Sequence, residues 1–360
     1  MGLIFYFIMY PHQKKIYGQE TLTQSKVELD INNASKRWFK PHIDSKILRE
    51  LSQRRDLPGW RHMIIFFGSL LVLGMLCIHS WGSFWFIPSY IAYCTLWGGA
   101  DAIWHECGHR TAFKSRRLND IFYYIGGFMN SFEPVRFRCS HSLHHNFTAS
   151  IDPHDFEVDG SIFWRPKSLL NFLIIFVPGM GLLNLHKSIQ REIVEHAFAV
   201  NTRVMEECIP DHKKANCIKV SRLFVFIWVS IILLSLYMGS FLPIFLLLIP
   251  KFFATLNIIW GITQHMGLRE DIKDHRHSTR SIRLNPVLSF IYWNMEYHIE
   301  HHMFPSVPSY NLPKLHKAIK DQLPEPQTLF QAYKEIIPAV IKKSKDPDYF
   351  IPVTVPQAST

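Results

Sequence analysis

The chain has 360 residues, of which 48% are hydrophobic and 14% aromatic, and its formal net charge is +10. A positive excess suits nucleic acid, an anionic membrane or acidic partners, but most of the basic residues flank long apolar runs, which favours a membrane and argues against nucleic acid. The six cysteines form no C-x-x-C pair, which excludes a disulfide framework.

Residues 1–61 are expected to form an N-terminal cytoplasmic arm. Residues 1–10 are apolar but too short to span a bilayer, and no small-residue cleavage site follows them, so no cleavable signal peptide is expected. Residues 11–61 are polar and basic, which indicates a water-exposed segment.

Two long apolar regions predict two helical hairpins, each crossing the bilayer and returning through a turn without charge. The predicted spans lie near residues 63–79, 84–100, 223–240 and 242–260. Lys251 lies within the last span, where a charge is costly, so we expect it to find a partner or to snorkel. These spans belong to an expected membrane domain at 62–322, with a C-terminal tail at 323–360.

Lys and Arg are frequent in residues 1–61, 101–220 and 261–360 and are missing from both hairpin turns. The positive-inside rule therefore places these three regions in the cytoplasm. Residues 169–185 are apolar enough to be a further crossing, although Pro178 and Gly179 fit poorly with a plain span.

Eight of the 20 histidines fall in three tight clusters, which read HECGH, HSLHH and HIEHH. Spacings of three and four residues place side chains on one face of a helix, so each cluster can converge on a metal ion. Imidazole suits zinc, copper, iron and nickel. Three such clusters beside apolar hairpins are difficult to explain as ordinary helix surface.

If the clusters build one site, an even number of crossings must separate the second cluster from the third. The second hairpin supplies two, so residues 169–185 are expected to lie along the interface or under the site rather than to cross.

His265 follows the second hairpin on the same side as the clusters, and we expect it to be a further ligand. Nine donors are too many for one ion of about four ligands and match two six-coordinate ions better. The predicted metal ligands are His105, His109, His141, His144, His145, His265, His298, His301 and His302.

Asp101 precedes His105 by one helical turn and is expected to accept a hydrogen bond from a ligand ring, or else to mark the end of a span. The remaining histidines were not expected to bind metal. His154 and His275 lie in charged loops and are expected to be solvated, and His196 fits an exposed amphipathic helix.

At these three histidine clusters the sequence resembles the membrane fatty-acid desaturase family. HECGH at 105–109, HSLHH at 141–145 and HIEHH at 298–302 match the three histidine boxes of the family, and the resemblance runs from about Trp60 to about Gln322. Within the family, WHECGHRTAF and EYHIEHHMFP are most similar to bacterial members related to dihydrorhizobitoxine desaturase.

The resemblance implies an all-α integral membrane protein, with four transmembrane helices in two hairpins and a cytoplasmic helical cap that holds a di-iron site. It also implies dioxygen as co-substrate and a fatty-acyl or lipid-like substrate, and it places an additional ligand at His265. No HPGG-type haem segment is present, so electrons are expected from a separate carrier, a ferredoxin or a b-type cytochrome with its reductase.

Two other activities remain open. Hydroxylation can be performed by the same type of centre, and spacing does not separate it from desaturation. A membrane zinc metalloprotease is the less favoured alternative, because HECGH satisfies H-E-x-x-H with Glu106 as general base but leaves six clustered histidines without a role.

Overall fold

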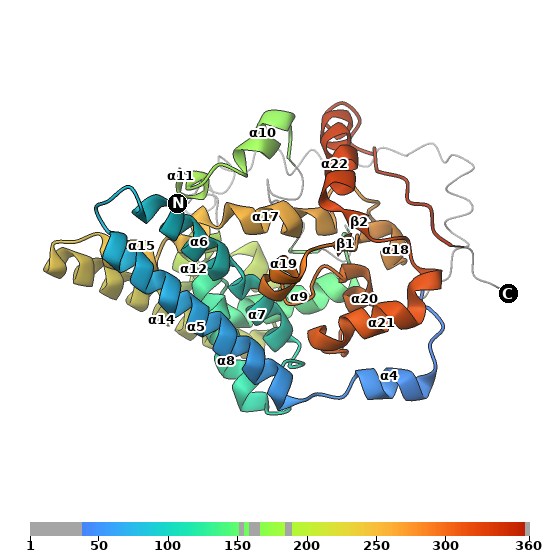
Figure 1. Ribbon diagram of the computed structural model, residues 1–360, viewed down its shortest axis with the longest axis horizontal. Coiled ribbons are helices and arrows are strands. Elements are labelled where there is room, and N and C mark those ends of the chain that lie inside the picture. Colours follow the sequence, from blue (N-terminus) through green and yellow to red (C-terminus); the bar gives the residue numbers. More distant parts are fainter. Residues whose placement is uncertain (1–37, 151–154, 158–165, 184–188, 357–360) are drawn as a thin grey trace. The chain divides into compact units, whose positions relative to one another are not determined.

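The computed structural model describes residues 38–150, 155–157, 166–183 and 189–356, and the fold below is that of the unit Phe39–Thr360 (Figure 1). Its regular structure is almost entirely helical, which confirms the predicted all-α class. Most of the predicted N-terminal arm, residues 1–37, lies outside the described residues.

Two helices in the described part of the chain are long and apolar enough to cross a membrane, α5 (Asp56–Ser80) and α14 (Asp211–Met238). At 1.5 Å per residue they are about 37 and 42 Å long, against about 30 Å for a bilayer core. Most of their apolar side chains are exposed, unlike those of a core helix in a soluble protein; Leu71 and Leu236 are examples. The predicted spans 63–79 and 223–240 therefore lie in long helices.

The two predicted return spans are not single long helices, and this corrects the expectation of four uninterrupted spans. The first, 84–100, is α6 (Phe86–Gly98), which leads directly into α7 (Ala100–Gly108). The second is divided among α15 (Leu242–Leu247), α16 (Pro250–Phe253), α17 (Thr255–Gly261) and the 3₁₀ turn η2 (Ile262–Gln264).

Proline explains these breaks. Pro243 and Pro250 lie in the first turns of α15 and α16, a position that proline favours because its missing N–H is not needed there. Lys251 of α16 donates a hydrogen bond to the carbonyl oxygen of Asn130, so of the two expected outcomes, a partner or snorkelling, it has a partner. Figure 1 shows that the α5–α6 and α14–α15 turns lie at the same end of this unit.

The chain between the two hairpins forms α8 (Arg116–Asn130), α9 (Pro134–Asn146), α10 (Leu169–Ile174), α11 (Met180–Leu183), α12 (Ile189–Ala197) and α13 (Arg203–Glu207). Helices α7 and α8 approach closely at Gly126, where an added Cβ would lie 2.9 Å from the backbone nitrogen of Trp104. Only glycine fits this contact. The 169–185 segment is described as far as residue 183 and is broken at Gly179, which has a positive φ, as Pro178 and Gly179 predicted.

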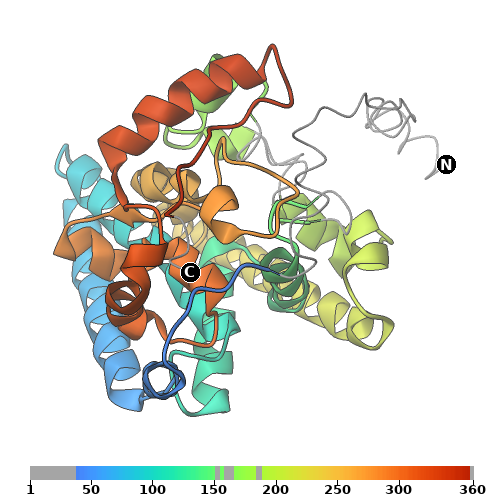
Figure 2. The same cartoon turned by 90° about the vertical axis from the view of Figure 1, so that its right-hand side faces the viewer.

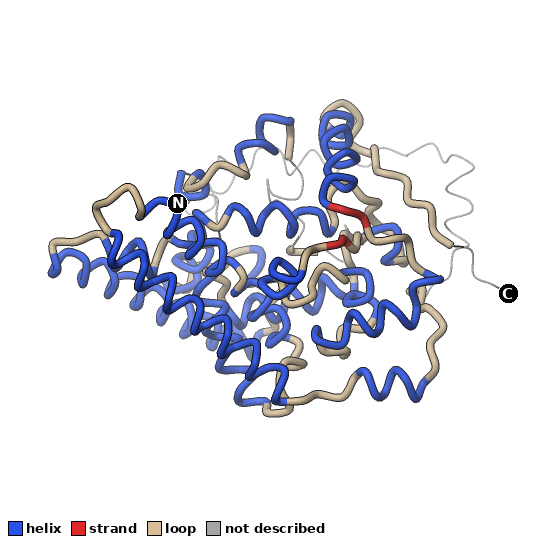
Figure 3. The backbone as a smooth tube through the Cα atoms, viewed as in Figure 1, coloured by secondary structure: helices blue, strands red, loops and turns tan. Residues whose placement is uncertain are grey.

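The remaining elements form the end of this unit opposite the hairpin turns, in front in Figure 2. They are α4 (Ser45–Leu51), α18 (His275–Ser278), α19 (Pro286–Ile291), α20 (His298–Met303), η3 (Ser309–Asn311), α21 (Leu312–Ile319), η4 (Lys320–Gln322) and α22 (Leu329–Lys343). A two-stranded parallel sheet, β1 (Ile282–Arg283) with β2 (Gln327–Thr328), ties the segment after His265 to the start of α22 (Figure 3).

Two buried apolar clusters hold these elements together. The larger runs through α5, α6, α7, α20 and α21 and includes Phe66, Ile103 and Leu312, all fully buried. The smaller one joins α9, α12, α13 and α14 through Val135, Ile193 and other residues. Both clusters fix the helices that carry the histidines.

Candidate metal centre

The nine predicted histidine ligands form two groups supplied mainly by α7, α9 and α20, the helices that Figure 1 shows next to one another within this unit. His105 is in α7 and His109 is its C-terminal cap residue, while the second and third clusters lie in α9 and α20. His265 directly follows η2.

Residues at the helix ends fix where these helices begin and in which direction they run. Glu133 is the N-cap of α9 and accepts hydrogen bonds from the backbone N–H groups of Val135 and Arg136, with Pro134 in the first turn. The approach to α20 contains a turn in which Trp293 and Asn294 both have positive φ values.

The nine rings form two groups, and in each group the nearest nitrogen atoms all lie within 4.8 Å of one another. The first group has five rings, and the second has four. The first comprises His105, His109, His141, His145 and His301, and the second His144, His265, His298 and His302. Because α9 and α20 each supply rings to both groups, the two groups are adjacent.

In five of the nine rings, Nδ1 faces a hydrogen-bond partner outside the cluster. His141 Nδ1 lies 3.1 Å from Glu157, and His144 Nδ1 lies 2.8 Å from Asp155. The partners of the other three are the carbonyl oxygen of Ser278 for His265, Gln264 for His298 and Thr148 for His302. Such partners fix the tautomer and direction of a metal-binding imidazole.

The tautomer can be worked out at His265 and His302. The carbonyl oxygen of Ser278 is only an acceptor, so Nδ1 of His265 carries the proton, and Nε2, which faces Nε2 of His298, is the unprotonated nitrogen. The hydroxyl of Thr148 donates to the carbonyl oxygen of His144 and can therefore accept from Nδ1 of His302. His302 Nε2 is thus also free to bind a metal.

Several of these Nε2 atoms face one another at short range. The distances are 2.8 Å for His109 and His141, 3.0 Å for His141 and His145, and 3.1 Å for His298 and His302. Two ring nitrogens at this range share either a proton or a metal ion, and a set of converging imidazole nitrogens suits metal ions.

Burial also favours neutral rings. It lowers the pKa of His105, His298 and His302 well below the ordinary value, and the neighbouring histidines lower it further. Burial lowers the pKa of His144 too, but Asp155 outweighs it and raises that pKa to about 9. A metal ion at His144 must therefore displace a proton when it binds.

The structure places three other histidines or carboxylates differently from the sequence predictions. Asp101 accepts a hydrogen bond from Trp104 Nε1 at 2.8 Å, and in the described part of the chain no hydrogen bond joins it to a histidine. Trp104 in turn lies edge-on to His105 and His141, so Asp101 supports the site through that ring.

The predicted solvation of His275 and the predicted exposure of His196 are both wrong. His275 is 3% exposed, its ring centroid lies 5.0 Å from that of His302, and burial lowers its pKa to about 3. His196 is fully buried and shares a hydrogen bond of 2.8 Å with Thr202. His154 lies outside the described residues.

Sequence reasoning missed the five groups that face Nδ1 atoms. Asp155 and Glu157 lie after the second cluster in a segment without helical periodicity, and Ser278 acts through its backbone. Only Gln264, directly before His265, was within a motif that the sequence singled out.

Comparison with known proteins identifies the family of the chain. The family model for the fatty acid desaturase domain matches residues 79–334. A "Delta(6)-fatty-acid desaturase fat-3" of Caenorhabditis elegans is 24% identical over 276 residues, covering 66% of this chain and 58% of that protein. A "Fatty acid desaturase" of Bacillus subtilis (strain 168) is 24% identical over 242 residues, covering 60% and 62%.

An "Acyl-CoA C20 Delta5-desaturase" of Anemone leveillei is 31% identical over 108 residues, which are 28% of this chain and 34% of that protein. This chain thus spans less than two thirds of the length of the curated relatives it matches. These relatives do not bear on the bacterial subgroup suggested by the sequence. Because the family model covers more than half of the chain and includes all nine clustered histidines, the protein belongs to the fatty acid desaturase family.

Proposed function

We propose that the protein is a dioxygen-dependent di-iron desaturase that introduces a double bond into a fatty-acyl or lipid-like chain. The observation that carries this proposal is the division of nine histidines, seven of them buried and two half-buried, into groups of five and four. A single zinc ion takes about four ligands, whereas two ions that keep open positions use a set of this size.

Reduced iron, when bound, would supply the activation of dioxygen that removal of hydrogen from an unactivated C–H bond requires. The chain itself contributes geometry. Asp155, Glu157 and Thr148 hold the rings in direction, and the edge of Trp104 covers His105 and His141. The surrounding apolar cluster limits the access of water to the site.

We further propose a multi-pass membrane protein with the metal centre on the cytoplasmic side. In this arrangement α5 and α14 cross the bilayer, and α6 and α15–α17 return as the other arms of two hairpins. The common end of the two hairpin turns and the lack of charge there support it. A separate carrier, a ferredoxin or a b-type cytochrome with its reductase, would deliver electrons.

Desaturation is favoured over hydroxylation because the curated relatives bear desaturase names. The position of Glu106 argues against the metalloprotease alternative. Glu106 is fully buried, and its Oε1 accepts a hydrogen bond of 3.1 Å from the backbone N–H of Ser309. A general base must instead reach a water molecule at the metal.

Metal analysis and an activity assay test the proposal. The full chain is purified from iron-supplied cells, and its iron and zinc are measured per chain. Lipids of a host that expresses the chain are then analysed for new double bonds and hydroxyl groups, with His301→Ala as the inactive control. We expect two irons, and unsaturated products only when dioxygen and reductant are present. One zinc with activity that does not need oxygen would refute the proposal, and hydroxylated products alone would refute desaturation.

A further inference from the structure

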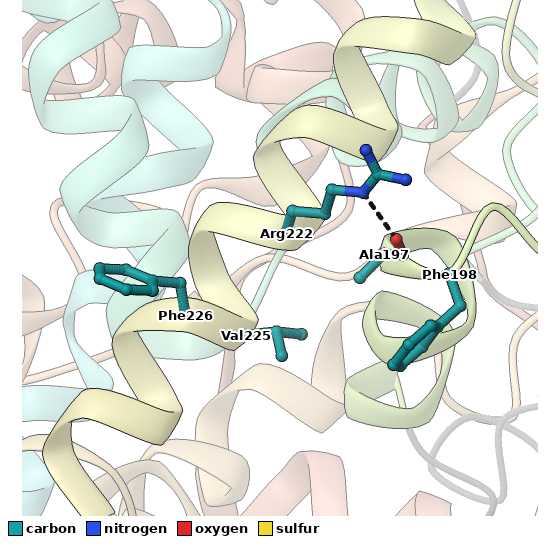
Figure 4. Close-up of a pocket in the computed structure, with 5 residues that line it drawn as sticks. All are labelled: Ala197, Phe198, Arg222, Val225 and Phe226. Carbon is teal, nitrogen blue, oxygen red and sulfur yellow. Dashed lines mark hydrogen bonds between the residues drawn. The ribbon is translucent and has the colours of Figure 1, made fainter. Parts of the chain in front are cut away.

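A groove with a volume of about 410 Å³ lies between the end of α12 and the middle of α14 (Figure 4). Its lining combines one cation with four apolar side chains. These residues are Ala197, Phe198, Arg222, Val225 and Phe226. None of them belongs to the metal centre.

Arg222 lies at the boundary between the charged and the apolar part of α14. It is the last charged residue of that helix, and the 16 residues that follow it, 223–238, carry no charge. Lys219, one helical turn earlier, is also exposed. Two cations therefore precede the segment of α14 that is apolar enough to lie in a bilayer.

The Arg222 guanidinium is held in place by only one of its nitrogens. Nε donates a hydrogen bond of 2.9 Å to the carbonyl oxygen of Ala197, at the end of α12. Within the described residues, Nη1 and Nη2 make no hydrogen bond or ion pair, and Figure 4 shows the guanidinium extending from α14 toward α12. Two adjacent N–H donors of an arginine match a phosphate group well.

The aromatic side chains that line the groove are themselves exposed. Phe198 is 77% exposed and Phe226 is 68% exposed. Phe226 lies four residues beyond Arg222, about 6 Å further along the helix axis toward the uncharged end. The order of cation and then apolar surface is the order of headgroup and acyl chain in a phospholipid, and large exposed aromatic side chains indicate contact with an apolar partner.

We propose that this groove binds a membrane phospholipid, with its phosphate on Arg222 and one acyl chain against Phe198 and Val225. The proposal rests on the insertion of α14 in a membrane and does not depend on desaturase activity. A lipid bound there bridges α12 and α14. Glu192 of α12 forms an ion pair of 2.7 Å with the buried Arg136 of α9, so the bound lipid also supports the helix that carries His141.

The test measures lipid retention by the purified full chain. Native mass spectrometry counts bound dioleoyl phosphatidylglycerol as detergent is exchanged, and the thermal unfolding midpoint is recorded with and without this lipid. The variants are Arg222→Gln and Phe198→Ala. The matched controls are Arg49→Gln, an exposed arginine of α4, and Phe330→Ala, a phenylalanine of α22 that is 79% exposed.

We expect the wild type and both controls to retain one lipid and to be stabilised by it. Arg222→Gln should bind at least about tenfold more weakly, because each charge-assisted hydrogen bond to the phosphate is worth about that factor. Phe198→Ala should also bind more weakly. If Arg222→Gln does not fold, the lipid retention of Phe198→Ala and of Arg222→Lys is compared with that of the wild type. Arg222→Lys keeps the charge of the side chain.

Three results would overturn the proposal. The first is that Arg222→Gln retains the lipid as strongly as the wild type. Wild-type retention by both Arg222→Lys and Phe198→Ala counts as the same result. The second is equal stabilisation of the wild type by inorganic phosphate at millimolar concentration, which would make the groove a simple anion site. The third is equal weakening by the control substitutions, which would make the binding nonspecific.

Discussion

His144 Nδ1 lies 2.8 Å from a carboxylate oxygen of Asp155, and this carboxylate also accepts hydrogen bonds from the backbone N–H groups of Ala149 and Glu157. Asp155 is 1% exposed. The direction of a ring in the second group is thus fixed by a residue that lies outside every histidine cluster.

Asp155→Asn should lower the affinity of the chain for iron about 10- to 100-fold, the usual effect of losing a partner of a metal ligand. The carboxylate of Asp155 accepts hydrogen bonds through both of its oxygens. An amide has only one oxygen, so it cannot accept from Ala149, Glu157 and His144 in the same geometry. Iron per chain is measured after dialysis against a graded series of chelator concentrations. Asp321→Asn, an exposed acid in η4, is the matched control. Unchanged iron affinity in Asp155→Asn would contradict the assigned role.

His301→Ala and His302→Ala remove neighbouring rings from different groups. Each should abolish turnover and leave fewer than two irons per chain, because each opens the donor set of one ion. His212→Ala, an exposed histidine in the first turn of α14, should retain activity and iron. Full turnover by either cluster variant would show that one of the groups is not required.

Glu106→Gln separates the desaturase from the metalloprotease. Glutamine keeps an oxygen that can accept from the Ser309 N–H, so the fold and most of the turnover should persist. Burial raises the pKa of Glu106 to about 7, so replacing this side chain with a neutral one should cost little stability. The measurement is product formation by the variant at equal iron content. Complete loss of activity with intact iron would give Glu106 a direct part in the reaction.

Cysteine labelling from both sides of the membrane tests the proposed topology. Single cysteines at Gly82 and Gly239 should react from the far side, and those at Ser115, His212 and Lys320 from the cytoplasm. All six natural cysteines are buried in the structure, so their background labelling should be low. Opposite labelling of positions 115 and 320 would be incompatible with one metal centre.

His275→Ala and His196→Ala should have different effects, although both rings are buried. His275 lies against His302, so its loss should reduce bound iron. The His196 substitution breaks the hydrogen bond to Thr202 and should cost about 1–3 kcal/mol of stability without changing iron content. Thermal inactivation midpoints and metal analysis of both variants distinguish the two effects. Normal iron in His275→Ala would assign that ring to packing alone.

The convergence of the histidine side chains within each cluster was predictable, because helical spacing brings residues three and four apart to one face. That reasoning applies to His141, His144 and His145 in α9 and placed them correctly near the other clusters. It fails for Asp155, which lies in irregular chain without helical periodicity, and for Ser278, which contacts His265 through its backbone carbonyl oxygen.

The expected fourth span shows another limit. A hydropathy pattern counts apolar residues and does not show where the backbone hydrogen bonds of a helix are interrupted. Residues 242–260 were therefore expected to form one helix. Pro250 begins a separate helix within it. The backbone of the return segment is held by Tyr90 and Tyr93, which donate to the carbonyl oxygens of Phe245 and Leu246. These are long-range contacts that one sequence does not reveal.

The sharing of α9 and α20 between the two groups affects how the centre would fill. α9 gives His141 and His145 to one group and His144 to the other, and α20 likewise divides His301 from His302. An ion that orders one group therefore also sets the backbone of the second, so the ordering entropy is lost only once. Iron should enter the empty chain cooperatively, with few singly loaded molecules at half saturation, and a mild chelator should withdraw both ions together.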